Sequence, residues 1–352
     1  MKVVLVVPVR GKNRWNGCVH WATDIAECIR FAFAGCVECE LLEVNLDHLA
    51  TVPRAPVDLA VHLEKAKVDI FHTHNMYLAL EPHSLGSLLA HLSQSKLKWL
   101  ESVHDVGLSF DMIEKGTRYL AEANVITHSR FNKDRINRFW KRNVPVVRLG
   151  INTKNYGEIK LGSDIPEILK LFCPGRLVAA KGALRVLKSI VDNCDIVGPV
   201  DFRVSAPTTN DLEFVDALYK ISKGCELVRI TTLSPTASRF EIFQDTHVTV
   251  VCPVQQEGFG LVGLESLACA VPLIVAPRGG MHDWAGSMPG AHCTSISGLA
   301  ESLINVRRNY PRAVLEASRG RTLIQKSLDI NHSAVALVEV YKQVMGGSLN
   351  SL

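Results

Sequence analysis

The stretch Val254–Ser266, VQQEGFGLVGLES, decides how the rest of the chain is interpreted. It follows HVTVVCP (His247–Pro253), an apolar and β-branched run typical of a buried parallel strand. Gly258 and Gly260 let the backbone turn sharply and approach a ligand closely. The next residues, LVGLESLACA, have helical character, so the turn offers free backbone N–H groups and a positive dipole end. These features predict an anion site at the start of a helix.

Two glutamates in this stretch are candidates for contacts with a ligand. Glu257 lies in the turn and Glu265 lies in the predicted helix. From that position Glu265 can reach a diol, such as a ribose, bound near the helix start. Acidic residues are also favoured at helix N-termini for their charge alone. The stretch by itself therefore leaves both interpretations open.

Length and composition limit the class of protein. The chain has 352 residues, which predicts two domains of ordinary size. Its 39 basic and 35 acidic residues give a net charge of +4, too small to indicate a nucleic-acid partner. The opening run KVVLVVPV is typical of a first strand rather than a signal peptide, and no apolar run reaches membrane-spanning length. We therefore expect a cytoplasmic protein.

The ten cysteines favour the same location, because they are scattered through apolar segments, as reduced thiols are. Cys36 and Cys39 form a single C-x-x-C pair. Without a second pair, a zinc or redox site is not favoured there.

The first half of the chain alternates strand-like and helical segments, which predicts a parallel sheet with helices on both faces. The strand candidates are KVVLVVPV, VECELLEV, VDIFHTH, KWLESVH, NVITHS and VPVVRL. Ligands bind at the carboxyl ends of such strands. There the sequence places His74 and Asn75, then His104 and Asp105, and later Ser129. Polar side chains at successive strand ends indicate a shared site rather than isolated structural residues.

Two basic segments in this half each have two interpretations. The loop Arg10–Gly17 ends in Gly17, which opens a helix, and its N–H groups either face a phosphate or form a plain turn. The segment Arg130–Arg142, RFNKDRINRFWKR, combines aromatic and basic residues. It is interpreted as a core-packed helix with a basic outer face, or alternatively as a helix lying on a membrane surface.

The second half repeats the alternation and adds two cations to the anion site. Arg176 and Lys181 lie in PGRLVAAKG, directly after a predicted strand. A guanidinium can bind phosphate oxygens with two parallel hydrogen bonds, and an ammonium acts as a point charge. Together with the helix start at Gly258–Gly263, they predict a pyrophosphate site. The sequence has no Walker-type loop and no Asp-x-Asp, so a carboxylate-held metal is not indicated.

These pieces, in this order, resemble glycosyltransferase family 4. The resemblance rests on EGFGLVGLES and GRLVAAKG, with weaker matches at SVHD, THSRF, LGINTKNY and the terminal helices. It implies the α/β GT-B fold, which has two Rossmann-like domains facing a cleft and a C-terminal helix that crosses back to the first domain. The expected domains are an acceptor domain, residues 1–155 with about 333–352, and a nucleotide-sugar domain, residues 156–332.

The resemblance also implies roles for individual residues. Arg176 and Lys181 match the pair that binds the diphosphate, and Glu265 matches the ribose-binding glutamate. Glu257 and His104 match residues that contact the donor sugar. The remaining expected donor contacts are Gly17, Gly258, Phe259, Gly260 and Leu261, and the expected acceptor cleft is formed by His74, Asn75, Asp105 and Ser129. The expected catalytic residues are His104, Arg176, Lys181 and Glu257.

The sequence departs from the family pattern in four places. Asn16 stands before Gly17 where a second glycine is usual, and Asn152 replaces an aspartate. The turn SAPTTND lacks the usual glycine, and Ala270 replaces a glycine before Pro272. These changes affect the expected phosphate contact at Gly17 and the donor contacts near Ser205–Thr209. They leave the Arg–Lys pair and the two glutamates intact.

The expected activity is transfer of a hexose-type sugar from a nucleotide diphosphate donor to a hydroxyl acceptor, with retention of configuration and without a metal or cofactor. UDP is the expected nucleotide, with GDP as the alternative. The acceptor is a glycan, a lipid-linked molecule or a small molecule, and Arg130–Arg142 is the candidate for peripheral membrane contact. The alternative functions are a non-catalytic nucleotide-sugar-binding protein and a sugar-nucleotide epimerase on the same fold.

Overall fold

The computed structural model describes residues 1–9, 17–104, 110–120, 123–162, 164–206, 211–234 and 237–347. The chain divides into two compact units. The first unit comprises Met1–Gly150 and Ile330–Leu352, and the second comprises Ile151–Asp329. Each unit is described separately below.

The first unit is built on a five-stranded parallel sheet of order β2-β1-β3-β4-β5. Its strands form where the sequence is apolar and β-branched, as expected for strands buried on both faces. Their bounds are β1 Lys2–Val9, β2 Glu38–Asn45, β3 Ile70–His74, β4 Lys98–Val103 and β5 Asn124–Thr127. In register, His74 pairs with Ser102 and Val103 pairs with Thr127, so the carboxyl ends of β3, β4 and β5 adjoin one another.

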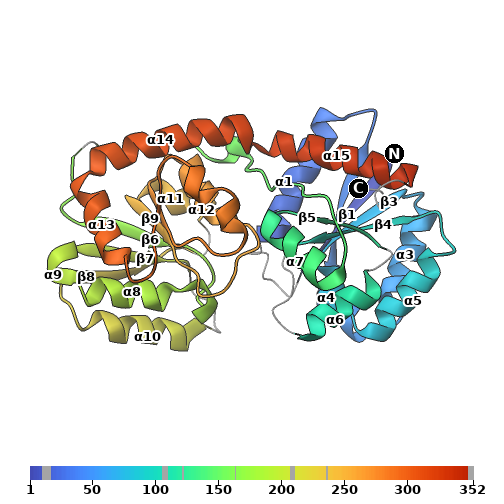
Figure 1. The fold of residues 1–352 in the computed structure, drawn as a ribbon, viewed down its shortest axis with the longest axis horizontal. Coiled ribbons are helices and arrows are strands. Elements are labelled where there is room, and N and C mark those ends of the chain that lie inside the picture. Colours follow the sequence, from blue (N-terminus) through green and yellow to red (C-terminus); the bar gives the residue numbers. More distant parts are fainter. Residues whose placement is uncertain are drawn as a thin grey trace. The chain divides into compact units, whose positions relative to one another are not determined.

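Helices cover both faces of this sheet (Figure 1). On one face, α1 (Gly17–Ala32) packs on β1 and β2. The other face carries an apolar core in which Phe71, Trp99 and Ile136 are buried together. The helices and short helical segments that contribute to this unit besides α1 are α2 Leu46–Thr51, α3 Ala55–Lys65, α4 Met76–Ala79, α5 Pro82–Leu92, α6 Phe110–Tyr119, α7 Arg130–Trp140 and α15 Ile330–Gly346.

The last helix, α15, belongs to the first unit although the whole second unit precedes it in sequence. It packs against α1 on the same face of the sheet. The hydroxyl of Ser333 accepts a hydrogen bond from the Gly150 N–H at 2.7 Å and donates one to the Arg148 carbonyl at 2.7 Å. Tyr341 lies within hydrogen-bond distance of His72 on β3, with 2.9 Å between the hydroxyl and Nδ1. The expected return of the C-terminal helix to the first domain is confirmed.

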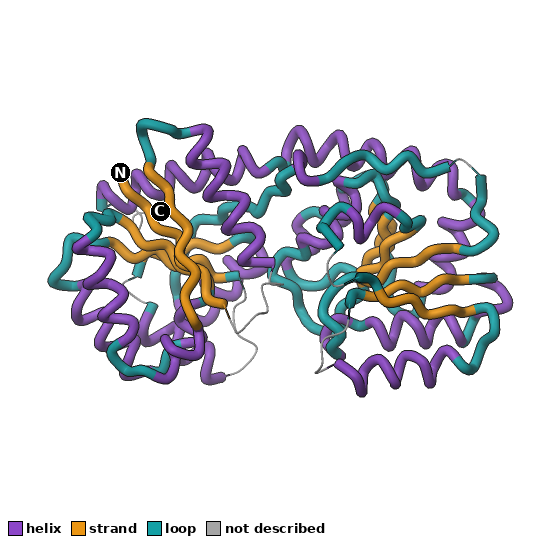
Figure 2. Tube along the Cα trace, turned by 180° about the vertical axis from the view of Figure 1, so that it is seen from behind, coloured by secondary structure: helices purple, strands orange, loops and turns teal. Residues whose placement is uncertain are grey.

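The second unit is built on a six-stranded sheet of order β11-β10-β9-β6-β7-β8, also parallel. Figure 2 shows its strands layered between helices. The strands are β6 Leu169–Cys173, β7 Val200–Val204, β8 Val228–Thr232, β9 Val248–Val251, β10 Leu273–Val275 and β11 Ala291–Cys293.

Helices also cover both faces of the second sheet. One face packs on α8 (Ala183–Val191), α10 (Leu212–Ser222) and α13 (Leu299–Arg308). On the other face α11 (Glu241–Gln244) brings Phe243 onto Phe172, with ring centroids 5.7 Å apart. The remaining segments are η1 Thr153–Asn155, η2 Ala179–Lys181, α9 Cys194–Val197, α12 Leu261–Ala268, η4 Gly280–Asp283, η5 Ala285–Ser287 and α14 Tyr310–Ser327.

Three details differ from the sequence expectations. The run VPVVRL is not a strand, because it makes only one isolated bridge, between Val146 and Thr127 at the edge of the first sheet. The short strand β11 was not predicted, since its three residues, AHC, carry no β-branched signal. Cys194 and Cys225 form a disulfide, although cysteines in apolar segments were expected to be reduced thiols.

The other cysteines of the described residues are free thiols, including Cys36 and Cys39. Burial raises the pKa of the Cys39 thiol to about 12, so Cys39 is not the low-pKa thiol of a redox centre.

Candidate functional site

The strand order of each sheet marks one place where a ligand is expected. In the second sheet the chain runs outward from β6 through β7 to β8, then returns to β9 and runs the other way to β11. The reversal lies between β6 and β9. In open parallel sheets the crevice outside the carboxyl ends of such a pair is the usual binding position. The loops after β6 and β9 are the two segments that carry the predicted donor residues.

The loop after β6 places two cations at this crevice. Arg176 is exposed, three residues beyond the end of β6. Lys181 is half-buried at the end of η2. Gly182 follows with φ +85° and directly precedes α8. A Cβ atom there would lie 2.1 Å from the carbonyl oxygen of Cys252, so only glycine lets this loop approach the end of β9 so closely.

Two further contacts join the loops after β6 and β9. The Val254 N–H donates to the Ala180 carbonyl at 2.8 Å. The Lys181 ammonium donates to the Glu257 carboxylate, with 2.6 Å between Nζ and Oε1. Both side chains of this ion pair remain partly exposed, at 30% for Lys181 and 21% for Glu257. The structure therefore brings together two of the predicted catalytic residues in one accessible pair.

The glycine-bearing turn ends at the helix start that the sequence predicts. Gly260, with φ +80°, precedes α12 and provides no side chain to cap its N–H groups. Phe259 is buried, and its carbonyl accepts a hydrogen bond from the Trp284 indole at 2.8 Å. The Glu257 carbonyl accepts from the Gly280 N–H at 2.8 Å. These two hydrogen bonds fix the backbone of the turn to Trp284 and Gly280. Gly258 and Leu261, which flank Phe259 and Gly260 in sequence, are half-buried.

Glu265 lies one turn into α12 and is half-buried. It is close to Tyr156, a fully buried residue beyond η1. Burial raises the pKa of the Tyr156 phenol, and the negative charge of Glu265 raises it further, whereas Arg239 opposes this effect. Glu265 therefore has structural neighbours in the second unit as well as its predicted role toward a ribose.

The first sheet has its own reversal, between β1 and β3. At the end of β3, His74 is buried and Asn75 adopts a left-handed conformation with φ +54°. The Asn75 side chain accepts a hydrogen bond from the His104 N–H at 2.9 Å. His74 Nδ1 and His104 Nε2 also lie 2.9 Å apart. The structure thus brings together three of the predicted polar residues at adjacent strand ends.

Two histidines that the sequence analysis did not assign to the site complete a buried cluster. His72 lies on β3, and His128 directly follows β5. The His104 and His128 rings are 4.2 Å apart, and the His72 and His74 rings are 4.6 Å apart. Burial lowers the pKa of all four imidazoles, that of His128 to about 4. At neutral pH this cluster is therefore uncharged.

Ser129 lies next to this cluster and caps a helix. Its buried hydroxyl accepts a hydrogen bond from the Asn132 N–H at 3.2 Å, at the start of α7. Ile136 and Trp140 on α7 face the core. Arg135 stacks over Phe131 and Phe139, at 5.5 and 5.3 Å from the ring centroids. These contacts agree with a core-packed helix whose outer face is basic.

Some predicted residues fall outside the described structure. They are Asp105, residues 10–16, which form the whole basic loop before Gly17 and include Asn16, and the turn at 207–210. Gly17 itself begins α1. Among the described helices, none combines the length and apolar character needed to span a bilayer.

The comparisons with known proteins identify the family and the fold. A model of family 4 glycosyltransferases in conflict systems matches residues 133–334, which is more than half of the chain. The chain belongs to glycosyltransferase family 4. A curated relative, the D-inositol 3-phosphate glycosyltransferase of Frankia alni, is 34% identical over 80 residues. That alignment spans 22% of this family 4 chain and only 20% of the relative.

Solved structures show that the fold of this family 4 protein is GT-B, as the sequence resemblance implied. Sucrose-phosphate synthase from Thermosynechococcus elongatus has a TM-score of 0.78 at 16% identity, covering 99% of this chain and all of that one. A glycosyltransferase from Rickettsia africae has a TM-score of 0.76 at 14% identity, covering 98% and 99%. HepE of Anabaena, in complex with UDP and glucose, has a TM-score of 0.73 at 12% identity, covering 97% and 99%. At these identities the likeness concerns the fold alone.

Proposed function

We propose that this protein transfers a hexose-type sugar from a nucleoside diphosphate donor to a hydroxyl acceptor, with retention of configuration. The observation that carries the proposal is the Lys181–Glu257 ion pair at the β6–β9 reversal of the second sheet. It joins the cation-bearing loop to the turn before α12, and both segments match family motifs. Residue roles in this proposal are our predictions from those motifs.

The proposed chemistry depends on stabilising a leaving diphosphate. Breaking a sugar–phosphate bond leaves negative charge on the diphosphate, and preorganised donors aimed at that charge supply the largest part of such catalysis. Arg176, Lys181 and the uncapped start of α12 are the donors. Charge-assisted hydrogen bonds of this kind are each worth about 1.5–3 kcal/mol. These groups take the part that a bound divalent metal plays elsewhere.

Glu257 has a specific part in this mechanism. In the structure it neutralises Lys181. A bound diphosphate provides a second anion for the ammonium, which releases the Glu257 carboxylate to accept hydrogen bonds from donor-sugar hydroxyls. Glu265 binds the ribose, and His104 contacts the donor sugar. The acceptor attacks the face from which the diphosphate leaves, and the leaving phosphate takes its proton.

UDP is the first donor nucleotide to test. HepE of Anabaena, which shares the fold, has been crystallised with UDP and with UDP-glucose. GDP is the alternative. The acceptor is expected to bind near His74, Asn75, Asp105 and Ser129, and its chemical class remains open among glycans, lipid-linked molecules and small molecules.

The setting of the activity is also our prediction from the sequence. We place the protein in the cytoplasm, and residues 130–142 are the candidate for a peripheral membrane contact. The exposed charged positions of this segment are Arg130, Asp134 and Arg138 on α7 and Lys141 just beyond it, so its outer surface is mostly basic. Sedimentation with anionic vesicles tests this contact.

A thermal-shift screen with UDP, GDP, ADP and their sugars tests the donor. A ligand present at a hundred times its Kd should stabilise the protein by about 2.7 kcal/mol. We expect UDP and UDP-sugars to give the largest shift. If no nucleotide shifts the transition, the proposal of a nucleotide-sugar donor is wrong.

Substitution of the two cations tests the mechanism. Arg176→Ala and Lys181→Ala should each lower transfer by one to two orders of magnitude, which is the rate equivalent of one lost charge-assisted hydrogen bond. Lys188→Ala is the matched control, because Lys188 forms a solvent-exposed ion pair with Asp192 at 3.1 Å on α8. Near-normal transfer by the Arg176 and Lys181 variants would overturn the diphosphate assignment. Release of free nucleotide without transfer would favour an epimerase.

A further inference from the structure

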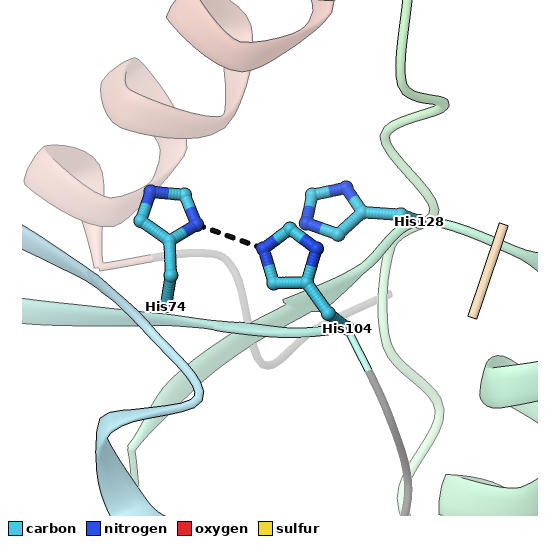
Figure 3. Close-up of side chains that lie close together, drawn as sticks. All are labelled: His74, His104 and His128. Atoms are coloured by element: carbon cyan, nitrogen blue, oxygen red, sulfur yellow. Dashed lines mark hydrogen bonds between the residues drawn. The ribbon is translucent and has the colours of Figure 1, made fainter. Parts of the chain in front are cut away.

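We propose that His74, His104 and His128 form a binding site for a transition-metal ion of the zinc type, on the first unit. Figure 3 shows the three imidazoles gathered at neighbouring strand ends. One nitrogen from each ring lies within 4.8 Å of the corresponding nitrogens of the other two. The binding itself does not depend on the proposed transferase activity.

The spacing of the nitrogens suits a metal after small movements of the rings. Two nitrogen ligands of a tetrahedral zinc ion, each about 2.0–2.1 Å from the metal, lie roughly 3.3 Å apart. His74 Nδ1 and His104 Nε2 are 2.9 Å apart, slightly closer than this. The widest separation in the group, up to 4.8 Å, must shorten by about 1.5 Å to reach that value. Rotation of the rings about their side-chain torsions covers such a distance.

The hydrogen bonds show which ring nitrogens carry protons and which carry lone pairs. His128 Nδ1 lies 2.7 Å from the Val147 carbonyl, and because a carbonyl only accepts, Nδ1 carries the proton. Nε2 of His128 therefore holds a lone pair, and it is buried without a hydrogen-bond partner among the described residues. Histidine ligands commonly donate their second ring N–H to a carbonyl in this way, which fixes the ring for the metal. His74 Nδ1 and His104 Nε2 share one hydrogen bond, so one of them carries the proton. Metal binding requires that proton to move to the other nitrogen of the same ring, which leaves a lone pair on both facing atoms.

The surroundings favour neutral imidazole, the form that binds metal. The three rings are largely withdrawn from water, with exposed fractions of 2% for His74, 6% for His104 and 1% for His128. Trp21 on α1 packs against all three, with ring centroids 5.3–6.4 Å away. His104 is the most exposed of the three. Three protein ligands with one open position are typical of non-structural zinc sites.

His72 is excluded from the ligand set although it lies on the same face of the sheet. Its Nδ1 lies 2.9 Å from the Tyr341 hydroxyl, and its Nε2 lies 2.6 Å from the Ser102 hydroxyl. Both nitrogens are therefore engaged. Because the three proposed ligands are all imidazoles, the site should select Zn²⁺, Ni²⁺ or Cu²⁺ over Mg²⁺ or Ca²⁺, which prefer oxygen.

Metal binding has a consequence for transfer, and this part rests on the proposed function. A metal-bound His104 nitrogen is not available to a donor sugar. Zn²⁺ should therefore lower the transfer rate at the same concentrations at which it fills the site. The ion would act as an inhibitor from the first unit, and the diphosphate chemistry on the second unit would still proceed without a metal.

The test is a binding titration on untagged, reduced, metal-free protein. Zn²⁺ is titrated in competition with a chromophoric chelator, and Co²⁺ is titrated by its visible d–d bands. We expect one tight equivalent of Zn²⁺ per chain and the bands of a four-coordinate Co²⁺. His128→Asn keeps a donor toward the Val147 carbonyl and removes Nε2. It should weaken binding by more than about 100-fold, since loss of an outer-shell partner alone weakens metal affinity by about 10–100-fold.

The matched control is His72→Asn, the same substitution of a buried histidine on the same sheet face. It should change the zinc affinity by less than about tenfold, below the range expected for a residue that supports a metal. If His128→Asn fails to fold, His104→Gln replaces it, because His104 is the least buried ligand. Equal affinity of the wild type and the folded ligand variant, or no tight site in the wild type, overturns the proposal. Zinc binding in a protein that shows no transfer would leave the metal site standing and refute only the proposed function.

Discussion

The two parallel sheets use the carboxyl ends of their strands in opposite ways. In the second unit, the crevice between β6 and β9 carries charged side chains that remain in contact with water, and Lys181 and Glu257 neutralise each other there. In the first unit, the ends of β3, β4 and β5 carry imidazoles that are buried and uncharged. The strand ends at the second-unit crevice therefore carry charges in contact with water, whereas those of the first unit carry uncharged side chains that are buried.

This difference shows that the topology places a site without determining its chemistry. An ion pair in contact with water can exchange one partner for a diphosphate at small cost, because exposed pairs are worth at most about 1 kcal/mol. A buried imidazole cannot accept a proton without a large penalty, so it offers its lone pair to hydrogen-bond donors or metals instead. Four experiments test the comparison, described below from the largest expected effect to the smallest.

The close approach of the Gly182 backbone to Cys252, at the crevice between β6 and β9, should be the feature most sensitive to substitution. Gly182→Ala should destabilise the second unit by about 4 kcal/mol or more, because its Cβ would collide with the Cys252 carbonyl oxygen. Gly35→Ala is the control, since Gly35 has almost the same φ, +87°, with no atom within 4 Å of the added Cβ. It should lose only about 1–2 kcal/mol through backbone strain. Urea unfolding of both variants measures the difference, and equal losses would show that the close approach is unimportant.

The buried histidines should make the first unit sensitive to acid. The pKa of His128 is lowered from 6.5 to about 4 in the folded protein. A lowered pKa contributes stability that is present above pH 6.5 and is lost as the pH falls toward 4. For His128 this amounts to about 3 kcal/mol. Hydrogen exchange between pH 7 and 4 should show opening of the first unit before the second, and His128→Asn should reduce that pH dependence.

Glu101 changes the pH dependence of stability in the opposite direction to the histidines. It must therefore be included in the same measurement. Burial raises the pKa of its carboxyl group from 4.5 to about 8. The stability that it contributes is full below pH 4.5 and is lost as the pH rises through 8. Glu101→Gln should therefore flatten the alkaline side of the curve. If the first unit is as resistant to acid as the second, the description of its strand ends as buried and uncharged is wrong.

The variant Glu257→Gln tests whether the Lys181 ammonium exchanges the Glu257 carboxylate for a bound diphosphate. This variant keeps the shape of the side chain and removes the charge that neutralises Lys181. UDP should bind up to about fivefold more tightly, corresponding to at most about 1 kcal/mol from a solvent-exposed pair. Transfer should fall by about 10–100-fold, because the donor sugar loses a charge-assisted contact. Calorimetry with UDP and steady-state rates separate the two effects, and weaker UDP binding would show that Glu257 positions Lys181 instead of competing for it.

Ser129→Ala should give the smallest change. It removes the hydroxyl that caps α7 and should lower stability by about 1 kcal/mol. Asn45→Ala is the control, because Asn45 caps α2 through the N–H groups of Asp47 and His48. Thermal unfolding should show similar losses. A rise in the acceptor KM confined to the Ser129 variant would support its predicted place in the acceptor cleft, and an unchanged KM would reduce its role to the cap.

The sequence singles out more of the residues that lie together after β6 and β9 than of those at the ends of β3, β4 and β5, for a physical reason. Arg176, Lys181 and Glu257 are polar residues directly after apolar strands, and a charge in such a position is easily recognised. His128 was overlooked because a single histidine inside THS gives no signal of its own. Its importance depends on the register that places it beside His104. Only the pairing of β4 with β5 shows that the two rings lie side by side.

Strands were predicted well where they are long and β-branched, and the two errors, VPVVRL and β11, both lie at sheet edges. The sequence of β1 indicates its full length, Lys2–Val9. The run VPVVRL has the same composition, yet it lies beyond β5, the last strand of its sheet, and makes a single bridge. Composition describes how a residue fits a pleated surface, but it does not report whether a neighbouring strand is available.

The position of α15 determines the order in which the protein can be completed on the ribosome. The first unit lacks this helix until the whole of the second unit has been synthesised. Until then His72 lacks its hydrogen bond with the Tyr341 hydroxyl, and the Gly150 N–H lacks its acceptor, Ser333. The helix α1 also lacks α15, against which it packs. The second unit, an uninterrupted stretch of chain, has no such delay. The domain that begins first is therefore expected to finish folding last.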